Sequence, residues 1–312
     1  MIQLIFIGTG AHGAPLLKAL AKDPRFNIAL VLTAEDKPAG RKMDLHPSPI
    51  KQVAQALGLP LYETDSINSE ASLAVLKAAQ PDMICLISYG HILKTPLLTL
   101  APYGAINVHL SLLPAYRGAS CYQQALLNGD TETGITVMKM VEAMDAGPIA
   151  HQHRLAIDNE DNAITLHDKL ADLSAHNVPN DLVAIAKGTL AFIPQDESKA
   201  SYCGKIHKSS GQIIWSEPAT TLHNQVRAYA GWPGSFAFWN EKRLKVLKTS
   251  TREVVDNNPR LLGHVIKQED SIVVQTGAGL LELLEVQIEG KNPQLIQQFV
   301  NGYKDFVGST LS

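Results

Sequence analysis

Short apolar runs alternate with longer mixed segments through the first half of the chain. The runs at 2–7, 28–32, 83–87 and 105–108 predict buried strands, and the segments 15–21, 49–57 and 69–79 have helical patterns. Strands that alternate with helices at this spacing are typical of a doubly wound, mostly parallel α/β sheet of the Rossmann-like kind. Residues 31–47 combine turn formers and charges without a period, and therefore predict a long loop.

The pattern changes after residue 134. Two apolar stretches around a polar turn, at 134–140 and 147–157, predict an antiparallel excursion, and 162–190 predicts a helix interrupted by Pro179. The polar segment 194–211 is interpreted as a linker. Several short apolar runs with turn residues between them follow, which predicts a small all-β barrel of the OB-like kind. The expected domains are 1–193, the linker 194–211 and the barrel 212–312.

Composition narrows the class of protein. The chain has 312 residues, of which 45% are hydrophobic and 18% are charged, and its net charge is -3. This composition is typical of a globular protein and excludes an overall basic nucleic-acid coat. The three cysteines are too widely spaced for a disulfide framework or a zinc cluster. The chain has no apolar run of about 18 residues and no charged leader, so we expect a soluble, cytoplasmic protein with no membrane partner. We also expect a monomer.

A glycine pattern near the start suggests one possible chemistry. Gly8, Gly10 and Gly13 form G-x-G-x-x-G after the first predicted strand, with Glu35 and Asp36 about twenty residues further on. This spacing is found in dinucleotide-binding turns, where glycines let a pyrophosphate approach a helix N-terminus. A nicotinamide-dependent oxidoreductase is therefore one hypothesis. A tight strand-to-helix turn that needs small residues is the structural alternative.

A second constellation indicates acyl transfer. Asn107 and His109 lie two residues apart at the end of a predicted strand, so their side chains point to the same side. The carboxyl ends of parallel strands face the ligand site in such sheets. An amide can hold the oxygen of a tetrahedral intermediate while an imidazole moves a proton. Asp145, in a later turn, could orient that imidazole, although it could equally be a plain turn residue.

The longer segments around these residues carry a family resemblance. Residues 107–118 read NVHLSLLPAYRG, and ETGITVMKM with EAMDAGPI follows at 132–149. This resembles the folate-dependent formyltransferase family. The resemblance implies Asn107, His109 and Asp145 as catalytic residues, 10-formyltetrahydrofolate as formyl donor and no metal. It also implies a folate pocket that is lined by two groups of residues: Ser111, Leu112, Leu113 and Pro114, and Ser88, Tyr89 and Gly90.

The rest of the chain favours one acceptor. Residues 36–51 resemble the insertion by which family members that act on methionyl-tRNA reach the acceptor arm, and the region after the linker resembles their second domain. Lys37, Arg41, Lys42 and Lys51 are therefore expected to contact tRNA phosphates. The implied reaction is formylation of the α-amino group of initiator methionyl-tRNA. A family member that acts on a nucleotide-linked amino sugar is the alternative.

The chain also departs from the family pattern. It has Leu110 where glycine is usual, and Ala119-Ser120-Cys121 after Arg117-Gly118, where the family pattern normally has Ala-Pro. Cys121 is interpreted as a buried thiol rather than a nucleophile. His151 and His153 are spaced H-x-H without an evident third ligand, so an exposed strand face is favoured over a metal site. Trp215, Trp232 and Trp239 are interpreted as core residues of the barrel rather than base-stacking platforms.

Overall fold

The computed structural model describes residues 1–39, 44–253 and 261–312, so Arg41 and Lys42 lie outside the described residues. Two compact units can be distinguished. The first contains residues 1–121, 132–156 and 167–204, and the second contains 122–131, 157–166 and 205–312. The domain boundaries that we derive from the sequence stay a prediction.

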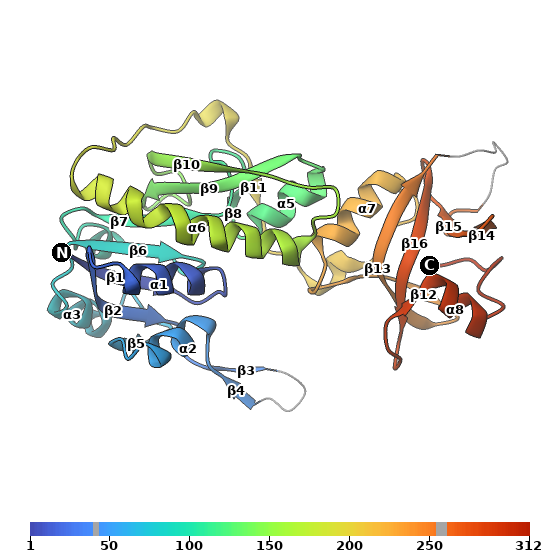
Figure 1. Ribbon diagram of the computed structural model, residues 1–312, viewed down its shortest axis with the longest axis horizontal. Helices are drawn as coiled ribbons and strands as arrows, with labels where there is room; N and C mark the ends of the chain where they lie inside the picture. The colour runs from blue at the N-terminus through green and yellow to red at the C-terminus, as the bar shows by residue number, and fades with distance from the viewer. Residues whose placement is uncertain (40–43, 254–260) are drawn as a thin grey trace. The chain divides into compact units, whose positions relative to one another are not determined.

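The first unit is built on a mostly parallel sheet. Among the described residues it has seven strands in the order β10-β9-β7-β6-β1-β2-β5 (Figure 1). Their bounds are β1 (Ile2–Gly8), β2 (Phe26–Thr33), β5 (Leu61–Glu63), β6 (Met83–Ile87), β7 (Ala105–His109), β9 (Glu132–Lys139) and β10 (Ile149–Ala156). Neighbouring strands from β5 to β7 are parallel, whereas β9 and β10 are antiparallel to their neighbours. The expected fold class and the antiparallel excursion are thus confirmed.

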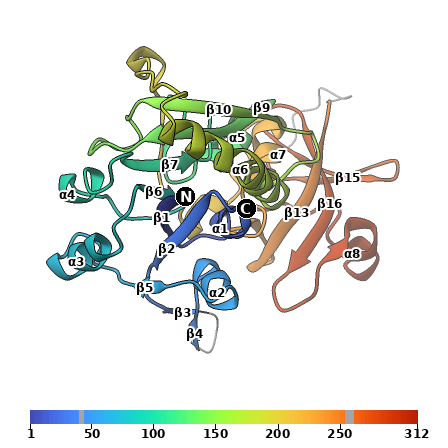
Figure 2. The same ribbon diagram turned by 60° about the vertical axis from the view of Figure 1, so that its left-hand side comes forward.

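Helices cover both faces of this sheet. Their bounds are α1 (Gly13–Lys22), α2 (Pro49–Ala56), α3 (Glu70–Ala78), α4 (Thr95–Leu98) and α6 (Ala163–Ala186). Figure 2 shows α1 and α6 on one side of the sheet and α3 and α4 on the other. Alternation along the strands explains the two layers, since Ile5 and Ile7 of β1 pack with Leu76 and Leu97 of the α3–α4 side. Helix α5 (Cys121–Asn128) follows the loop after β7.

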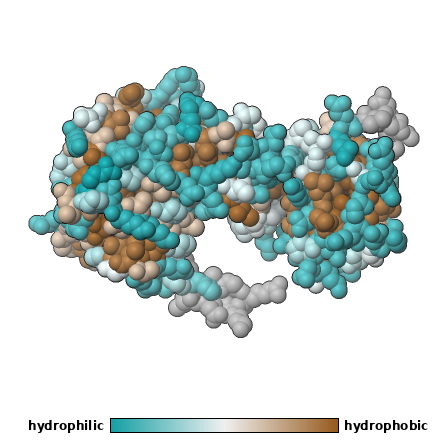
Figure 3. Space-filling view, in the orientation of Figure 1, coloured by the Kyte–Doolittle hydropathy of each residue, from teal (hydrophilic) through white to brown (hydrophobic). Residues whose placement is uncertain are grey.

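The prediction that the helix is interrupted at Pro179 is wrong. The helix is continuous through Pro179, which is buried together with Val178 and Leu182. Proline removes one backbone hydrogen bond, but burial of an apolar face can outweigh that loss. The outward face of α6 is largely hydrophilic in Figure 3.

Two other segments differ from the sequence expectation. The long loop expected at 31–47 contains a short antiparallel pair, β3 (Lys37–Ala39) with β4 (Asp44–His46). The expected linker contains a 3-10 turn at Glu197–Lys199, and β11 (Tyr202–Cys203) pairs in parallel with β8 (Arg117–Gly118). The polar sequences of these two segments do not indicate the strands, because short strands without alternation carry almost no periodic signal.

The second unit is built on an antiparallel sheet. Among the described residues the strand path is β12-β13-β16-β15-β14, with β17 paired to β16, and no pairing joins β12 to β14. The elements are α7 (Ala219–Ala228), β12 (Ser235–Trp239), β13 (Lys242–Arg252), β14 (Val265–Gln268), β15 (Ser271–Gln275), β16 (Leu280–Ile288), β17 (Gln294–Leu295) and α8 (Ile296–Gly302). Trp215 and Trp239 are buried in its core as expected, whereas Trp232 is exposed.

Within the described parts of the chain, no helix has the length and apolar character needed to span a membrane.

Candidate active site

Strand β7 places two of the three predicted catalytic side chains. Asn107 and His109 are both buried, at 7% and 6% exposure. Since β7 lies between β6 and β9, its backbone is held on both sides and the two side chains project from a rigid strand. Alternation puts both on one face of the sheet, where the parallel strands end.

The His109 ring has three polar neighbours. Its Nε2 lies 2.9 Å from the carbonyl oxygen of Tyr116 and therefore donates a hydrogen bond to it. Its Nδ1 lies 3.7 Å from Oδ2 of Asp145. The side chain of Cys121 is also within hydrogen-bonding reach of the ring. The structure thus brings together His109 and Asp145, which are 36 positions apart in the chain.

These neighbours decide the charge of the ring. Burial alone would lower the pKa of the imidazole, because the charged form loses solvation. The Cys121 sulfur, the Asp145 carboxylate and the Tyr116 carbonyl outweigh burial, and together they raise the pKa to about 9. The environment of His109 therefore favours the protonated ring, an imidazolium. Because Nε2–H is committed to Tyr116, the proton that faces the polar side of the site is on Nδ1.

Asp145 is positioned by two contacts. The backbone N–H of Gly118 donates to its Oδ2 at 2.8 Å. The side-chain amide of Gln195 donates to the carbonyl oxygens of Asp145 and Gly147, both at 2.7 Å. Asp145 itself has a φ of 50°, a left-handed conformation that its short polar side chain tolerates. The turn is thus held by groups that are distant in sequence.

Gln195 also contacts a buried arginine. Arg117 is 1% exposed, and its Nη2 donates to Oε1 of Gln195 at 2.8 Å and to Oε1 of Glu197 at 2.7 Å. Its Nη1 donates to the hydroxyl of Tyr202 at 3.0 Å. The Glu197 carboxylate raises the pKa of Arg117 above its usual range. Sequence reasoning missed Gln195, because it lies in the segment that we interpret as a linker.

The loop after β7, which is expected to bind the folate formyl donor, is held mainly by hydrogen bonds to strands of the sheet. The Ser111 hydroxyl donates to the carbonyl of Ala115 at 2.7 Å, and the Leu113 N–H donates to Oγ1 of Thr136 at 3.0 Å. Gln152 of β10 donates to the Leu113 carbonyl at 2.8 Å. Leu112 and Pro114 complete the segment, in which the Leu113–Pro114 peptide is cis. Its place next to β7 is compatible with the expected role, which stays a prediction.

The other expected folate residues follow β6. Ser88 has a φ of 50°, and its carbonyl accepts hydrogen bonds from the N–H groups of Thr9 and Gly10, both at 3.3 Å. Burial raises the pKa of Tyr89 to about 12, so its hydroxyl stays protonated. A Cβ at Gly90 would meet no neighbouring atom. The role of these residues as contacts to the folate formyl donor also stays a prediction.

The glycine pattern has a packing explanation. A Cβ at Gly8 would lie 2.8 Å from the Ile87 carbonyl oxygen, and one at Gly13 would lie 2.8 Å from Cγ2 of the same residue. A Cβ at Gly10 would lie 2.9 Å from Cβ of Ser88. The three glycines let the turn after β1 pass close to the end of β6. This favours the tight-turn interpretation over the dinucleotide site.

The structure describes two of the four basic residues that are expected to contact tRNA. Lys37 lies on β3, and Arg41 and Lys42 fall outside the described residues. Lys51 of α2 forms ion pairs with Asp36 at 2.6 Å and Glu63 at 2.8 Å. Two carboxylates therefore already neutralise Lys51, which reduces what it can contribute to a phosphate contact.

Comparison with protein families identifies the class. The Formyl transferase family matches residues 2–182, and the Formyl transferase C-terminal domain matches residues 205–304. The chain therefore belongs to the formyl transferase family, and its fold is that of an enzyme of this class.

Full-length relatives narrow the comparison. A methionyl-tRNA formyltransferase of Halothermothrix orenii is 37% identical over 99% of this chain and 100% of its own length. The enzyme with the same name from Caldicellulosiruptor saccharolyticus is 38% identical over 100% of both chains.

Solved structures share the fold at lower identity. An N-formyltransferase from Helicobacter canadensis, in complex with folinic acid and dTDP-3-aminofucose, has a TM-score of 0.67 at 17% identity and covers 91% of this chain and 99% of its own. A methionyl-tRNA formyltransferase from Clostridium thermocellum has a TM-score of 0.58 at 13% identity and covers 91% and 97%. At these identities the likeness shows the fold alone.

Proposed function

We propose that this protein transfers the formyl group of 10-formyltetrahydrofolate to the α-amino group of initiator methionyl-tRNA. The observation that carries the proposal is the His109–Asp145 pair next to Asn107 at the end of β7. It occurs in a chain that matches enzymes named for this activity over their whole length. As in any member of this family, the site must handle a tetrahedral intermediate with a negatively charged oxygen.

The residues of the site supply charge stabilisation rather than a nucleophile. The unprotonated amine of the acceptor attacks the formyl carbon, and the carbon–nitrogen bond to the folate then breaks. Asn107 donates a hydrogen bond to the oxygen that becomes negative, and the His109 imidazolium stabilises the same charge. His109 gives its Nδ1 proton to the departing folate nitrogen, and Asp145 receives the proton that leaves the amine through water.

Donor binding is assigned to two loops that flank this group. The loop after β7, from Ser111 to Pro114, would hold the pteridine side through main-chain groups and apolar contact. Ser88, Tyr89 and Gly90 after β6 would line the same pocket. Two hydrogen bonds support this assignment, because they hold the first loop in one conformation: Leu113 N–H donates to Thr136, and Gln152 donates to the Leu113 carbonyl.

Acceptor binding is assigned to residues 36–51 and the second domain. Lys37, Arg41 and Lys42 would contact phosphates of the acceptor arm, with a smaller contribution from Lys51 because of its ion pairs. We further propose that residues 1–193 form the catalytic domain and 212–312 the second domain, joined by 194–211. The protein would act as a cytoplasmic monomer.

One assay tests the function. Purified protein is given 10-formyltetrahydrofolate with methionyl-tRNA, with free methionine or with a nucleotide-linked amino sugar, and the formylated product is measured. Transfer to methionyl-tRNA only, lost in Asn107→Ala, is the expected result. Transfer to the amino sugar instead would reject methionyl-tRNA as the acceptor but support the formyl-transfer chemistry. Failure with all three acceptors would reject the proposal.

A further inference from the structure

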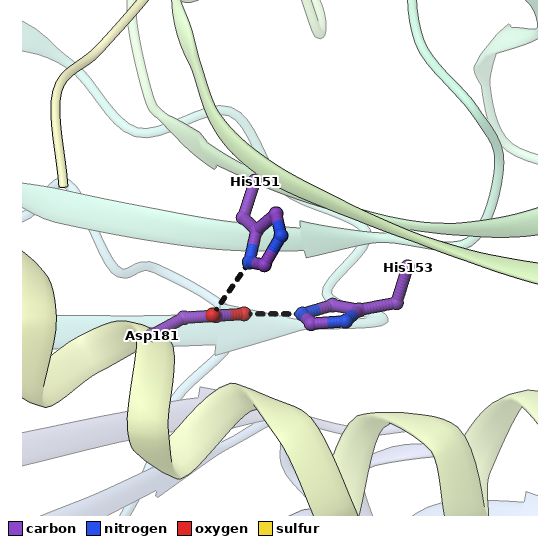
Figure 4. Close-up of side chains that lie close together, drawn as sticks. All are labelled: His151, His153 and Asp181. Carbon is purple, nitrogen blue, oxygen red and sulfur yellow. Dashed lines mark hydrogen bonds and ion pairs between the residues drawn. The ribbon is translucent and has the colours of Figure 1, made fainter.

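Three potential metal ligands meet outside the candidate active site (Figure 4). His151 and His153 lie on β10, and Asp181 lies on α6. Nδ1 of His151 is 2.8 Å from Oδ1 of Asp181, and Nε2 of His153 is 2.6 Å from Oδ2. The expectation that no third ligand lies near the two histidines is therefore wrong. Asp181 is about thirty positions further along the chain, and only the packing of α6 brings it there.

The fold explains the convergence. Residues 151 and 153 point to the same face of β10 because strand side chains alternate. Asp181 belongs to the inward face of α6, and its side chain is 8% exposed. A carboxylate rarely occupies such a position unless it is paired. The His153 side chain is 15% exposed and that of His151 is 48% exposed, so solvent reaches the group from the His151 side.

The geometry fits a transition-metal ion after a small adjustment. The three ligand atoms all lie within 4.8 Å of one another. Ligands bound about 2.0–2.1 Å from a tetrahedral ion are roughly 3.3 Å apart. An ion at this place would replace the two hydrogen bonds to Asp181, and each imidazole would move away from the carboxylate oxygen that it now contacts. The exposed side would leave the fourth position to water.

We propose that His151, His153 and Asp181 bind one Zn²⁺ ion or a similar divalent transition metal. Two neutral imidazoles and one carboxylate suit Zn²⁺ and Ni²⁺, whereas Mg²⁺ prefers oxygen ligands in an octahedron. The proposal concerns a site separate from formyl transfer, because none of the three residues contacts Asn107, His109 or Asp145 in the hydrogen bonds described above. It therefore does not rest on the proposed function.

Bound metal would join the edge strand of the sheet to the long helix. Gln152 lies between the two histidines and points to the opposite face of β10, where it donates to the Leu113 carbonyl. A metal that fixes β10 against α6 would thus also steady the strand that supports the donor loop. We assign the site a structural role on this basis.

The test is a titration of the full-length chain without an affinity tag, after treatment with a chelator. Zn²⁺ is added in an isothermal calorimeter, with Mg²⁺ as the comparison ion. We expect one equivalent of Zn²⁺ to bind with a Kd of about 1 µM or tighter, and no binding of Mg²⁺. Co²⁺ in place of Zn²⁺ should give the visible absorption bands of a four-coordinate ion.

Variants locate the site. His151→Gln, His153→Gln and Asp181→Asn should each weaken Zn²⁺ binding by more than the ~10–100-fold typical of residues that only support a ligand. The matched controls are His176→Gln, an exposed histidine of the same helix, and Asp168→Asn, a carboxylate that pairs with His167. Both controls should bind Zn²⁺ as the unmodified chain does.

Thermal unfolding supplies a second readout. Zn²⁺ should raise the Tm of the unmodified protein and leave that of His151→Gln unchanged. His151 is half exposed, so this variant should fold even if Asp181→Asn does not. Absence of saturable Zn²⁺ binding at roughly 100 µM, or binding that all three variants retain, would overturn the proposal.

Discussion

Replacing Asp145 with asparagine tests the electrostatic basis of the candidate site. Asp145→Asn keeps an oxygen that can accept from the Gly118 N–H, so the turn should be preserved. What it removes is a negative charge 3.7 Å from Nδ1 of His109. The variant therefore changes the charge around the imidazole with little change in shape.

The expected magnitude follows from the titration of His109. A pKa that rises from 6.5 to about 9 corresponds to about 3 kcal/mol in favour of the imidazolium. Cys121 and the Tyr116 carbonyl share this effect with Asp145. An opposite charge at such a distance typically accounts for at least about one pH unit, or about 1.4 kcal/mol. We therefore expect the pKa of His109 to fall to about 8 or lower.

Two measurements check the expectation. Nuclear magnetic resonance of labelled histidine gives the pKa of His109 in both proteins. Steady-state kinetics should show kcat reduced by about 10²-fold or more, with the KM for the folate donor nearly unchanged, because the charge acts on the transferring proton. An unshifted His109 titration together with near-normal turnover would refute the assigned roles.

Three further predictions follow from the same structure. Asn107→Ala should lower kcat about 10²–10³-fold by removing the donor to the negatively charged oxygen, with an unchanged Tm; a loss confined to KM would contradict that role. Arg41→Ala combined with Lys42→Ala should raise the KM for charged tRNA and flatten its salt dependence, and identical salt slopes would reject the contact. The raised pKa of His109 adds stability to the folded protein that is fully present below pH 6.5. The free energy of unfolding should therefore fall by about 3 kcal/mol as the pH rises through 9. Denaturant titrations at several pH values can measure this loss, which should be smaller in Asp145→Asn.

Much of the first sheet could be predicted because its strands are continuous apolar runs. Strands β1, β2, β6 and β7 match the expected runs closely, and alternation within β7 placed Asn107 and His109 on one side. The short β5 was missed because its three residues carry no period. Local pattern is sufficient where an element buries both of its faces.

Contacts between distant segments could not be predicted in this way. The sequence shows neither that Cys121 reaches His109 nor that Asp181 reaches two histidines, because both depend on how helices pack. Likewise, the hydrogen bonds of Gln195 to the Asp145 turn connect segments fifty positions apart. Residue types suggested the chemistry, but tertiary packing determines which partners each group has.

The buried guanidinium of Arg117 has a consequence for how this protein can be divided or synthesised. Its acidic partner, Glu197, lies beyond residue 182, where the match to the first family domain ends. A fragment cut there would retain Asn107, His109 and Asp145 but lose Glu197, the counter-ion of Arg117, and Gln195, which holds the Asp145 turn. On the ribosome, the same dependence means that the reactive centre can mature only after nearly two thirds of the polypeptide has emerged.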